Sequence, residues 1–425
     1  MLTMLTAGLL VGCAAPCGER SLRDPAPHTL EVTWPTSGDQ VGTLRYSLDG
    51  EVKPPITADV EAGSYVARLE ELPPLASLEY ALWSGEQEVC QDQLINSPGP
   101  VALPRLYVSE TSAGAWSRLV GVLMGSDYTL FSIDRQGRYR WHHTETSPDV
   151  ALIDVHPTAS GVLHNRFDEH RLRDIGEIRT LDWEGTVTDT RQTPQAHHVF
   201  APLPDGGLAF LATEVREWRD PETGEQEAVV GDVLWERTPD GQLREVFNLW
   251  EHEEPVRHDR WDNDFYPQGS DWSHGNGLSY SADRGSFLVS FGHLDLIYEI
   301  DRTTGAPLLR IDPEQWQTLG SRLDFPHSPT WSGPDRLMVF SYGDGEGGAI
   351  EYRVDAEASV LEEVWSWIEP GPAEAFLGQA QRLSDDSVLI SFGSEGRAVE
   401  IINDEVAWEL ETPLGIWLGS MRPRP

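Results

Sequence analysis

Histidines stand at similar places in several parts of this sequence. Each precedes a turn that leads into an apolar run, and the set is His156, His197, His198, His274 and His327. An imidazole can attack an electrophile, transfer a proton or bind a metal ion. A single histidine at the start of a strand is most often a hydrogen-bonded structural residue. Histidines at equivalent positions of a repeat form one site only if the fold brings them together.

A repeated unit runs through the chain from about residue 105. It consists of a turn, an apolar strand, a second strand that ends near an aspartate, a Gly or Asp turn, and a further strand that often carries Trp. The aspartates are Asp134, Asp182, Asp240, Asp301, Asp355 and Asp404, and their separations run from 48 to 61 residues. This spacing is typical of propeller blades. The sequence therefore predicts an all-β protein in which residues 105–425 form a six-bladed β-propeller.

The two ends of this repeat are incomplete. The first unit lacks its innermost segment, while "LGIWLGSMRP" at the C-terminus belongs to no unit. We therefore expect the C-terminal strand to complete the first blade and close the ring, so that no sheet edge is left open. The innermost strands of a propeller surround its central channel. The histidines are accordingly predicted to converge at one mouth of that channel.

The N-terminal part has a different pattern. Residues 27–100 alternate apolar and polar side chains in short runs separated by Gly, Pro and Asp, which predicts a small β-sandwich. The run "GSYVARLEELPPLASLEYALW" is similar to the late strands of a fibronectin type III domain. We expect "NSPGPVALP" to be the linker to the propeller.

The first 26 residues resemble a signal for export. The run "MLTMLTAGLLVGC" is apolar but too short to span a bilayer, and its end resembles a bacterial lipoprotein signal in which Cys13 is lipidated. The sequence thus predicts a periplasmic or membrane-anchored lipoprotein. An oxidising compartment would allow Cys17 and Cys90 to pair.

The charge of the chain narrows the choice of partners. The sequence has 70 acidic and 31 basic residues, which gives a formal net charge of -39. Such a surface repels the phosphates of nucleic acids, so a nucleic-acid partner is excluded. We expect small molecules as ligands.

The order of three motifs indicates a protein family, and it is more specific than any one of the motifs. "HHVFAPLPDGGLAFLA", "DWSHGNGLSYSADRGSFLVSFGHLDLIYEIDRTTG" and "FPHSPTW" succeed one another much as in the bacterial arylsulfotransferase (aryl-sulfate sulfotransferase) family, and the resemblance covers most of residues 105–425. It implies an exported six-bladed propeller with an N-terminal β-domain. The implied reaction moves a sulfuryl group from an aryl sulfate to a phenol acceptor, with neither a nucleotide donor nor a cofactor.

The resemblance also implies roles for individual residues. His327 would be the nucleophile that forms a sulfohistidine, and His198 and His274 would bind the sulfuryl oxygens with Asn276 beside them. We expect the remaining members of the substrate-binding set to be His156, His197, His293 and Arg166.

One position departs from the family. The family's middle motif ends in Ser-Arg-His, whereas this sequence has Phe291, Gly292 and His293, so the arginine that would hold the sulfate is missing. The hypothesis from sequence is that Arg166, in "LHNRFDEH", supplies a guanidinium from a neighbouring blade.

Two other classes of function remain open. A non-catalytic ligand-binding propeller would explain the lost arginine. A metal-dependent hydrolase would use the convergent imidazoles as ligands, but the sequence has no HExxH pair and no obvious acidic ligand near the ring, so no metal is expected. The long polar segment 251–272 is predicted to cover the channel mouth.

Overall fold

The structure is a computed structural model that describes residues 17, 21–23, 28–36, 39–73, 76–95, 103–147, 149–168, 174–261, 265–371 and 376–425. The described residues form two compact units, one within 17–103 together with 139–142, and the other comprising the rest. Cys13, most of the export signal and most of the linker lie outside the described residues. Within them, no helix is long and apolar enough to cross a bilayer.

The N-terminal unit consists of two antiparallel sheets packed on one core. One sheet has the order β1-β2-β7-β6, with β1 at Ser21–Arg23, β2 at Leu30–Pro35, β6 at Asp59–Glu61 and β7 at Ser64–Leu69. The other has the order β4-β3-β8-β9 with β5 beside β3, and its strands are β3 at Gly42–Leu48, β4 at Glu51–Val52, β5 at Ile56–Thr57, β8 at Ser77–Ser84 and β9 at Gln87–Ile95.

The core of this unit draws on alternating positions of both sheets. Val32 and Trp34 of β2 pack with Leu82 of β8, and all three are buried. A disulfide joins Cys17 to Cys90 of β9. These features make the unit a β-sandwich, and its likeness to a fibronectin type III domain stays a prediction.

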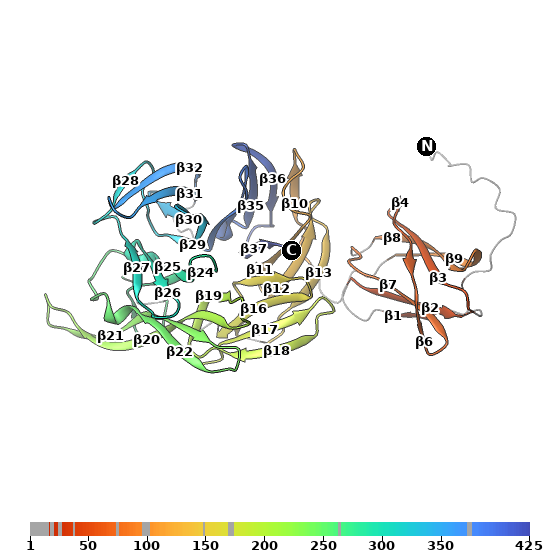
Figure 1. Ribbon diagram of the computed structural model, residues 1–425, viewed down its shortest axis with the longest axis horizontal. Coiled ribbons are helices and arrows are strands. Elements are labelled where there is room, and N and C mark those ends of the chain that lie inside the picture. The colour runs from red at the N-terminus through yellow and green to blue at the C-terminus, as the bar shows by residue number, and fades with distance from the viewer. Residues whose placement is uncertain are drawn as a thin grey trace. The chain divides into compact units, whose positions relative to one another are not determined.

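Six sheets follow in the described residues from 103 onward, and their pairings are antiparallel except for the short strands β23 and β28 (Figure 1). The first has the order β13-β12-β11-β37, with β11 at Arg118–Met124, β12 at Tyr128–Asp134, β13 at Tyr139–Thr144 and β37 at Trp417–Pro423. The second has the order β14-β16-β17-β18 with β15 beside β16, and comprises β14 at Val150–Ala151, β15 at Val155–Thr158, β16 at Gly161–Asp168, β17 at Glu177–Asp182 and β18 at Val187–Gln192. The third comprises β19 at Ala196–Pro202, β20 at Leu208–Arg219, β21 at Gln226–Arg237 and β22 at Leu243–Asn248, with β23 at Ser270–Asp271 parallel to β21.

The remaining sheets repeat this plan. The fourth comprises β24 at Gly275–Ser281, β25 at Ser286–Phe291, β26 at Leu296–Asp301 and β27 at Pro307–Ile311. The fifth comprises β28 at Gln317–Leu319, β29 at His327–Gly333, β30 at Arg336–Gly343, β31 at Glu346–Asp355 and β32 at Val360–Pro370. The sixth comprises β33 at Gly378–Ser384, β34 at Ser387–Phe392, β35 at Arg397–Ile402, β36 at Glu405–Glu411 and β10 at Tyr107–Glu110. Short 3-10 turns lie at Leu249–Glu251 (η1), Gly292–Leu294 (η2) and Gly393–Glu395 (η3).

The ring closes where the two ends of the propeller meet. β37 pairs with β11 as the innermost strand of the first sheet, and β10 pairs with β36 as the outermost strand of the sixth. In Figure 1 the blue sixth sheet accordingly lies beside the orange β10. Neighbouring inner strands touch around the ring: β37 contacts β15, β19 contacts β24, β24 contacts β29, and β29 contacts β33. The predicted six-bladed propeller, closed by the C-terminal strand, is confirmed.

The repeated aspartates have a local structural role. Oδ1 of Asp134 accepts hydrogen bonds from the backbone N–H groups of Gln136 and Arg138, both at 3.0 Å. Equivalent bonds form at Asp182 and Asp301, each at the end of the third strand from the channel. An aspartate that binds the backbone ahead of it stabilises a tight turn, which explains why the repeat is marked by this residue.

The apolar runs pack between neighbouring sheets. All six residues of β25 are buried. Phe287 and Val289 belong to the core shared with the third sheet, whereas Leu288 belongs to the core shared with the fifth. Successive strand residues point to opposite faces, so a strand covered on both sides reads as a continuous apolar run.

Candidate active site

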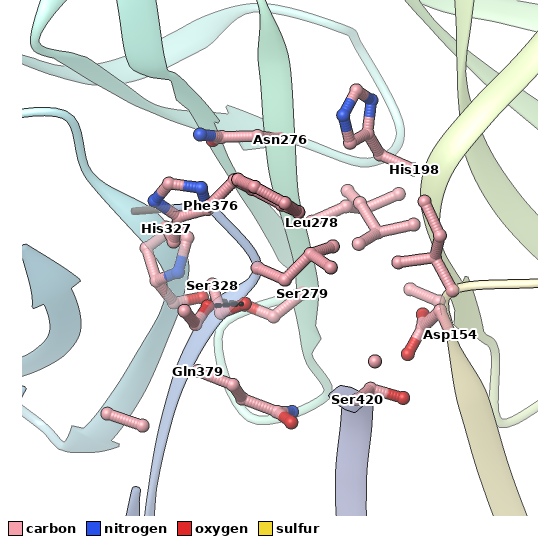
Figure 2. Close-up of a pocket in the computed structure, with 18 of the residues that line it drawn as sticks. Asp154, His198, Asn276, Leu278, Ser279, His327, Ser328, Phe376, Gln379 and Ser420 are labelled. Carbon is pink, nitrogen blue, oxygen red and sulfur yellow. Dashed lines mark hydrogen bonds between the residues drawn. The ribbon is translucent and has the colours of Figure 1, made fainter. Parts of the chain in front are cut away.

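A cavity of about 750 Å³ occupies the channel of the propeller. The inner strands supply most of its wall, and Figure 2 labels ten of the lining residues. His156, His198, His274, His293 and His327 all line it. The predicted convergence of the strand-start histidines is thus observed, although His197 does not reach the cavity.

Three of these histidines lie next to β-bulges in the inner strands. The pairing register shifts after His197 in β19, after Gly275 in β24 and after His327 in β29. Next to these bulges, the backbones of His198 and His274 are left-handed, with φ of 49° and 51°. Non-glycine residues rarely adopt this conformation, and bulges commonly re-aim side chains near functional sites.

His327 is placed as a neutral imidazole. Its Nδ1–H donates to the carbonyl oxygen of Phe325 at 3.0 Å, so its lone pair lies on Nε2. The side chain is buried, and burial, aided by the charge of His274, lowers its pKa to about 3. A buried, deprotonated imidazole is suited to nucleophilic attack.

His274 is held by a buried carboxylate. Its Nδ1 lies 2.6 Å from Oδ2 of Asp271, and its backbone N–H donates to the other oxygen at 3.0 Å. Its ring stacks on His293 with centroids 4.6 Å apart. Burial raises the pKa of Asp271 to about 7 and lowers that of His293 to about 4.

His198 is held by a chain of two further groups. Its Nδ1 lies 2.7 Å from Nδ1 of His197, whose Nε2 lies 2.9 Å from Oδ1 of the buried Asp232. Burial acts to raise the pKa of Asp232, but the hydrogen bonds and charge of its partners hold the pKa below its ordinary value. A protonated His198 would donate from Nδ1 to Nδ1 of His197, whereas Nε2 of His197 is not aligned for a hydrogen bond to the carboxylate. The negative charge of Asp232 behind the histidine pair therefore favours positive charge on His198.

Asn276 supplies a donor to the cavity. Its Oδ1 accepts a hydrogen bond from Ser290 Oγ at 2.7 Å, which fixes the orientation of the amide. Its Nδ2 is buried and has no hydrogen-bond partner among the described residues. A buried donor without a partner is costly, so this amide is suited to an oxygen of a bound substrate.

The glycine that replaces the family's arginine is tightly packed. A Cβ atom on Gly292 would lie 2.6 Å from Nδ2 of Asn276 and 3.0 Å from the ring of Phe325. The backbone N–H of Gly292 donates to the carbonyl oxygen of His274 at 2.9 Å, which holds η2 against the histidine. An arginine at this position would therefore displace Asn276.

The resemblance to arylsulfotransferases implies sulfuryl transfer, and we expect Gly292→Arg to lower the rate of that reaction by about ten- to a hundredfold, through loss of one hydrogen bond to a charged oxygen. Initial rates with an aryl sulfate measure this effect. Gly125→Arg is the control, because a Cβ there would meet only Ile416 at 3.7 Å. A folded Gly292→Arg variant that gained activity would contradict this account of the pocket.

Arg166 does not supply the missing guanidinium. It is buried in β16, where its Nε lies 2.5 Å from Glu145 and its Nη1 pairs with Glu177. The guanidinium that lines the cavity, within the described residues, belongs to Arg422 of β37. Its Nη2 lies 3.2 Å from Oδ1 of Asp154. We therefore leave Arg166 out of the candidate site.

His156 lies in the cavity wall together with Asp154 and Arg422. Its Nε2 lies 3.1 Å from Oδ2 of Asp154 and 2.9 Å from the carbonyl oxygen of Phe200. Burial and the nearby charge of Arg422 lower the pKa of His156. This polar group is distinct from the contacts of His198, His274 and His327.

The long segment before β24 contributes to the wall. Phe265 lines the cavity and stacks on His198 with ring centroids 5.5 Å apart. Arg260 pairs with Asp295 at 2.6 Å and with Asp324. Part of the predicted cover thus reaches the cavity, while residues 262–264 lie outside the described residues.

Sequence reasoning missed the carboxylates of this site. Asp271 precedes His274 by three residues in "DWSH", so a search for acids near each histidine would have found it. Asp232 lies in β21, outside the motifs around the histidines, and gave no signal. Arg422 lies in the strand already predicted to be innermost, so its place at the channel could have been inferred. The expectation that no acid lies near the histidines is wrong.

Fold and site together define a β-propeller with a histidine-lined channel. The model of the Arylsulfotransferase (ASST) family matches residues 105–318, about half of the chain. The protein belongs to the arylsulfotransferase family. No curated protein matches the sequence significantly.

Solved structures with a similar arrangement are distant. A protein of unknown function from Bacteroides caccae has a TM-score of 0.46 and 13% identity, covering 72% of this chain and 98% of its own. The nidogen/laminin complex has a TM-score of 0.40 and 11% identity, covering 72% of this chain and 97% of its own. A putative 6-phosphogluconolactonase from Bacteroides fragilis has a TM-score of 0.38 and 9% identity, covering 91% of this chain and 100% of its own. Likeness at this level carries no argument about function.

Proposed function

We propose that the protein transfers a sulfuryl group from an aryl sulfate to a phenol through a sulfohistidine at His327. The observation that carries the proposal is the neutral, buried imidazole of His327 in the same cavity as Asn276, whose amide nitrogen has no hydrogen-bond partner among the described residues. Membership of the arylsulfotransferase family supports the substrate class.

The first half of the proposed reaction forms the covalent intermediate. Nε2 of His327 attacks sulfur, the bond from sulfur to the aryl oxygen breaks, and the electron pair leaves with the phenolate. His198 gives its Nε2 proton to that oxygen, and phenol departs. Sulfuryl transfer resembles phosphoryl transfer in placing charge on peripheral and leaving oxygens, so donors such as Asn276 and His274 stabilise the transition state.

The second half restores the enzyme. An acceptor phenol gives its proton to His198, and its oxygen attacks the sulfur of the sulfohistidine. The bond from sulfur to Nε2 breaks, and His327 recovers its lone pair. Donor and acceptor use the same cavity in turn, which predicts ping-pong kinetics.

The walls of the cavity are suited to aromatic substrates. Met124, Leu278, Phe265 and Phe376 line it with apolar surface, and its volume of about 750 Å³ falls in the range of sites for small molecules. We infer that aryl groups pack against these side chains while the sulfuryl group meets the histidines.

The proposal is tested by mixing the protein with 4-nitrophenyl sulfate in the absence of an acceptor. We expect a burst of one equivalent of 4-nitrophenol, with a sulfo adduct on the peptide "LDFPHSPTW". The N–S bond is acid-labile, so the digest is kept neutral or alkaline. Absence of both burst and adduct would favour a ligand-binding propeller without catalysis.

A metal-dependent hydrolase is the second candidate. Asp271, His274 and His293 have the residue types and proximity of a metal site, which favours it. The products separate the two reactions: a transferase sulfates an added phenol, whereas a hydrolase releases inorganic sulfate at the same rate with or without the phenol.

We also propose that the protein is exported and anchored through a lipid on Cys13. The sequence "LVGC" and the disulfide between Cys17 and Cys90 support the proposal, because disulfides persist in oxidising compartments. Cell fractionation tests it: we expect the chain in the membrane fraction and its Cys13→Ala variant in the soluble one. Equal distribution of the two would contradict the anchor.

A further inference from the structure

Three potential metal ligands meet at one wall of the cavity. Asp271 ends β23, His274 precedes β24, and His293 lies in η2 after β25. Each offers a ligand atom, and these atoms lie within 4.8 Å of one another. Backbone hydrogen bonds from η2 to the His274 segment hold this arrangement. The three positions are thus brought together where the third and fourth sheets meet.

The chemistry of the three groups matches one class of ion. Two imidazoles and a carboxylate are typical ligands of zinc and related divalent transition metals, and three protein ligands leave a position open for a further molecule. Asp271 and His293 are also linked by a hydrogen bond from Nδ1 to the Asp271 carbonyl oxygen at 3.1 Å, which orients the ring.

The surrounding charge favours a cation. Asp232 is also buried, and it accepts hydrogen bonds from Ser273 Oγ and the Gly275 N–H on either side of His274. In the described residues the two carboxylates contact imidazoles, the Ser273 hydroxyl and backbone N–H groups. A divalent ion would stabilise both negative charges at once.

We propose that Asp271, His274 and His293 bind a divalent transition-metal ion of the zinc type. The ion would be held by a carboxylate oxygen and one ring nitrogen from each histidine. His274 and His293 line the cavity, whereas Asp271 does not, so the open coordination position would face the cavity.

The ion would have a role in the proposed reaction, and this step rests on the proposed function. A cation beside the cavity would attract a sulfuryl oxygen and supply positive charge where the tightly packed Gly292 leaves no room for a side chain. Metal binding itself does not depend on that role.

The experiment titrates untagged, chelator-treated protein with Zn²⁺ by calorimetry and with Co²⁺ by visible absorption. We expect one equivalent to bind, and Co²⁺ to give the absorption bands of a low-symmetry site. His293→Gln and Asp271→Asn should each weaken binding by about a hundredfold or more, since even outer partners of a metal site contribute ten- to a hundredfold.

His252→Gln is the matched control, because His252 is exposed and stacks on Phe247 outside the cluster. It should bind Zn²⁺ as the unaltered protein does. Thermal melting checks that each variant is folded, and His293→Gln keeps the test valid should Asp271→Asn fail to fold. Failure to bind one equivalent, or equal binding by folded His293→Gln, would overturn the proposal.

Metal binding and sulfuryl transfer fail separately. A protein that forms the sulfo adduct but binds no Zn²⁺ refutes the metal site alone. A protein that binds Zn²⁺ but forms no adduct refutes the transferase and leaves the metal site intact.

Discussion

Replacing His327 by asparagine is expected to abolish the phenol burst and the sulfo adduct together. The asparagine Nδ2 can still donate to the carbonyl oxygen of Phe325, as the imidazole Nδ1 does, so local structure is retained. The lone pair on Nε2 is lost, and an amide nitrogen does not replace it as a nucleophile. We expect turnover to fall by about 10⁴-fold or more, as for other enzymes that lose a covalent nucleophile.

Stopped-flow absorbance at the 4-nitrophenolate band measures the burst, and mass spectrometry of the neutral digest detects the adduct. His252→Asn should retain the full burst amplitude, because that side chain lies outside the cavity wall. A folded His327→Asn variant with an undiminished burst would remove the nucleophile assignment and with it the proposed mechanism.

Replacing Asp232 by asparagine is expected to lower the turnover rate by a factor that depends on the basicity of the leaving phenolate. Asp232 accepts hydrogen bonds from Ser273 Oγ and the Gly275 N–H, and lies beside His197 Nε2. An amide nitrogen facing His197 would favour its other tautomer, which places N–H against His198 Nδ1. The negative charge that favours protonated His198 would also be lost, as when the carboxylate of a catalytic triad is replaced.

The measurement compares two donors. Phenyl sulfate releases a basic phenolate that needs a proton, so its turnover should fall by about 10²- to 10⁴-fold. The 4-nitrophenyl ester releases a more stable anion and should be affected far less. Asp154→Asn, which alters a carboxylate that pairs with His156 and Arg422, should affect both donors alike. An equal loss for both donors in Asp232→Asn would show that Asp232 is only structural.

The sequence alone determined the ring and its closure. Asp134, Asp182 and Asp301 mark turns through hydrogen bonds to residues two to four positions ahead, so the signal is local. Strand burial likewise leaves continuous apolar runs such as β25. The C-terminal segment belongs to none of these units, and an open sheet edge is unfavourable, so the sequence predicted that this segment completes the first blade. The repeat also places His198, His274 and His327 at or near the starts of inner strands.

Only the tertiary structure decided what surrounds those histidines. Asp232 reaches the His197–His198 pair from a different strand of its sheet, and Arg166 is paired with Glu145 and Glu177 instead of facing the cavity. These contacts join residues far apart along the chain, and no periodicity records them.

The packing at Gly292 was also beyond the sequence. The residue could be identified as a departure from the family, but the sequence did not show what occupies the place of the missing side chain. The neighbouring amide of Asn276 and ring of Phe325 in fact fill that space. Strand pattern and turns follow from interactions between near neighbours in the chain, whereas the shape and charge of the cavity depend on which side chains different sheets bring within a few ångströms of one another.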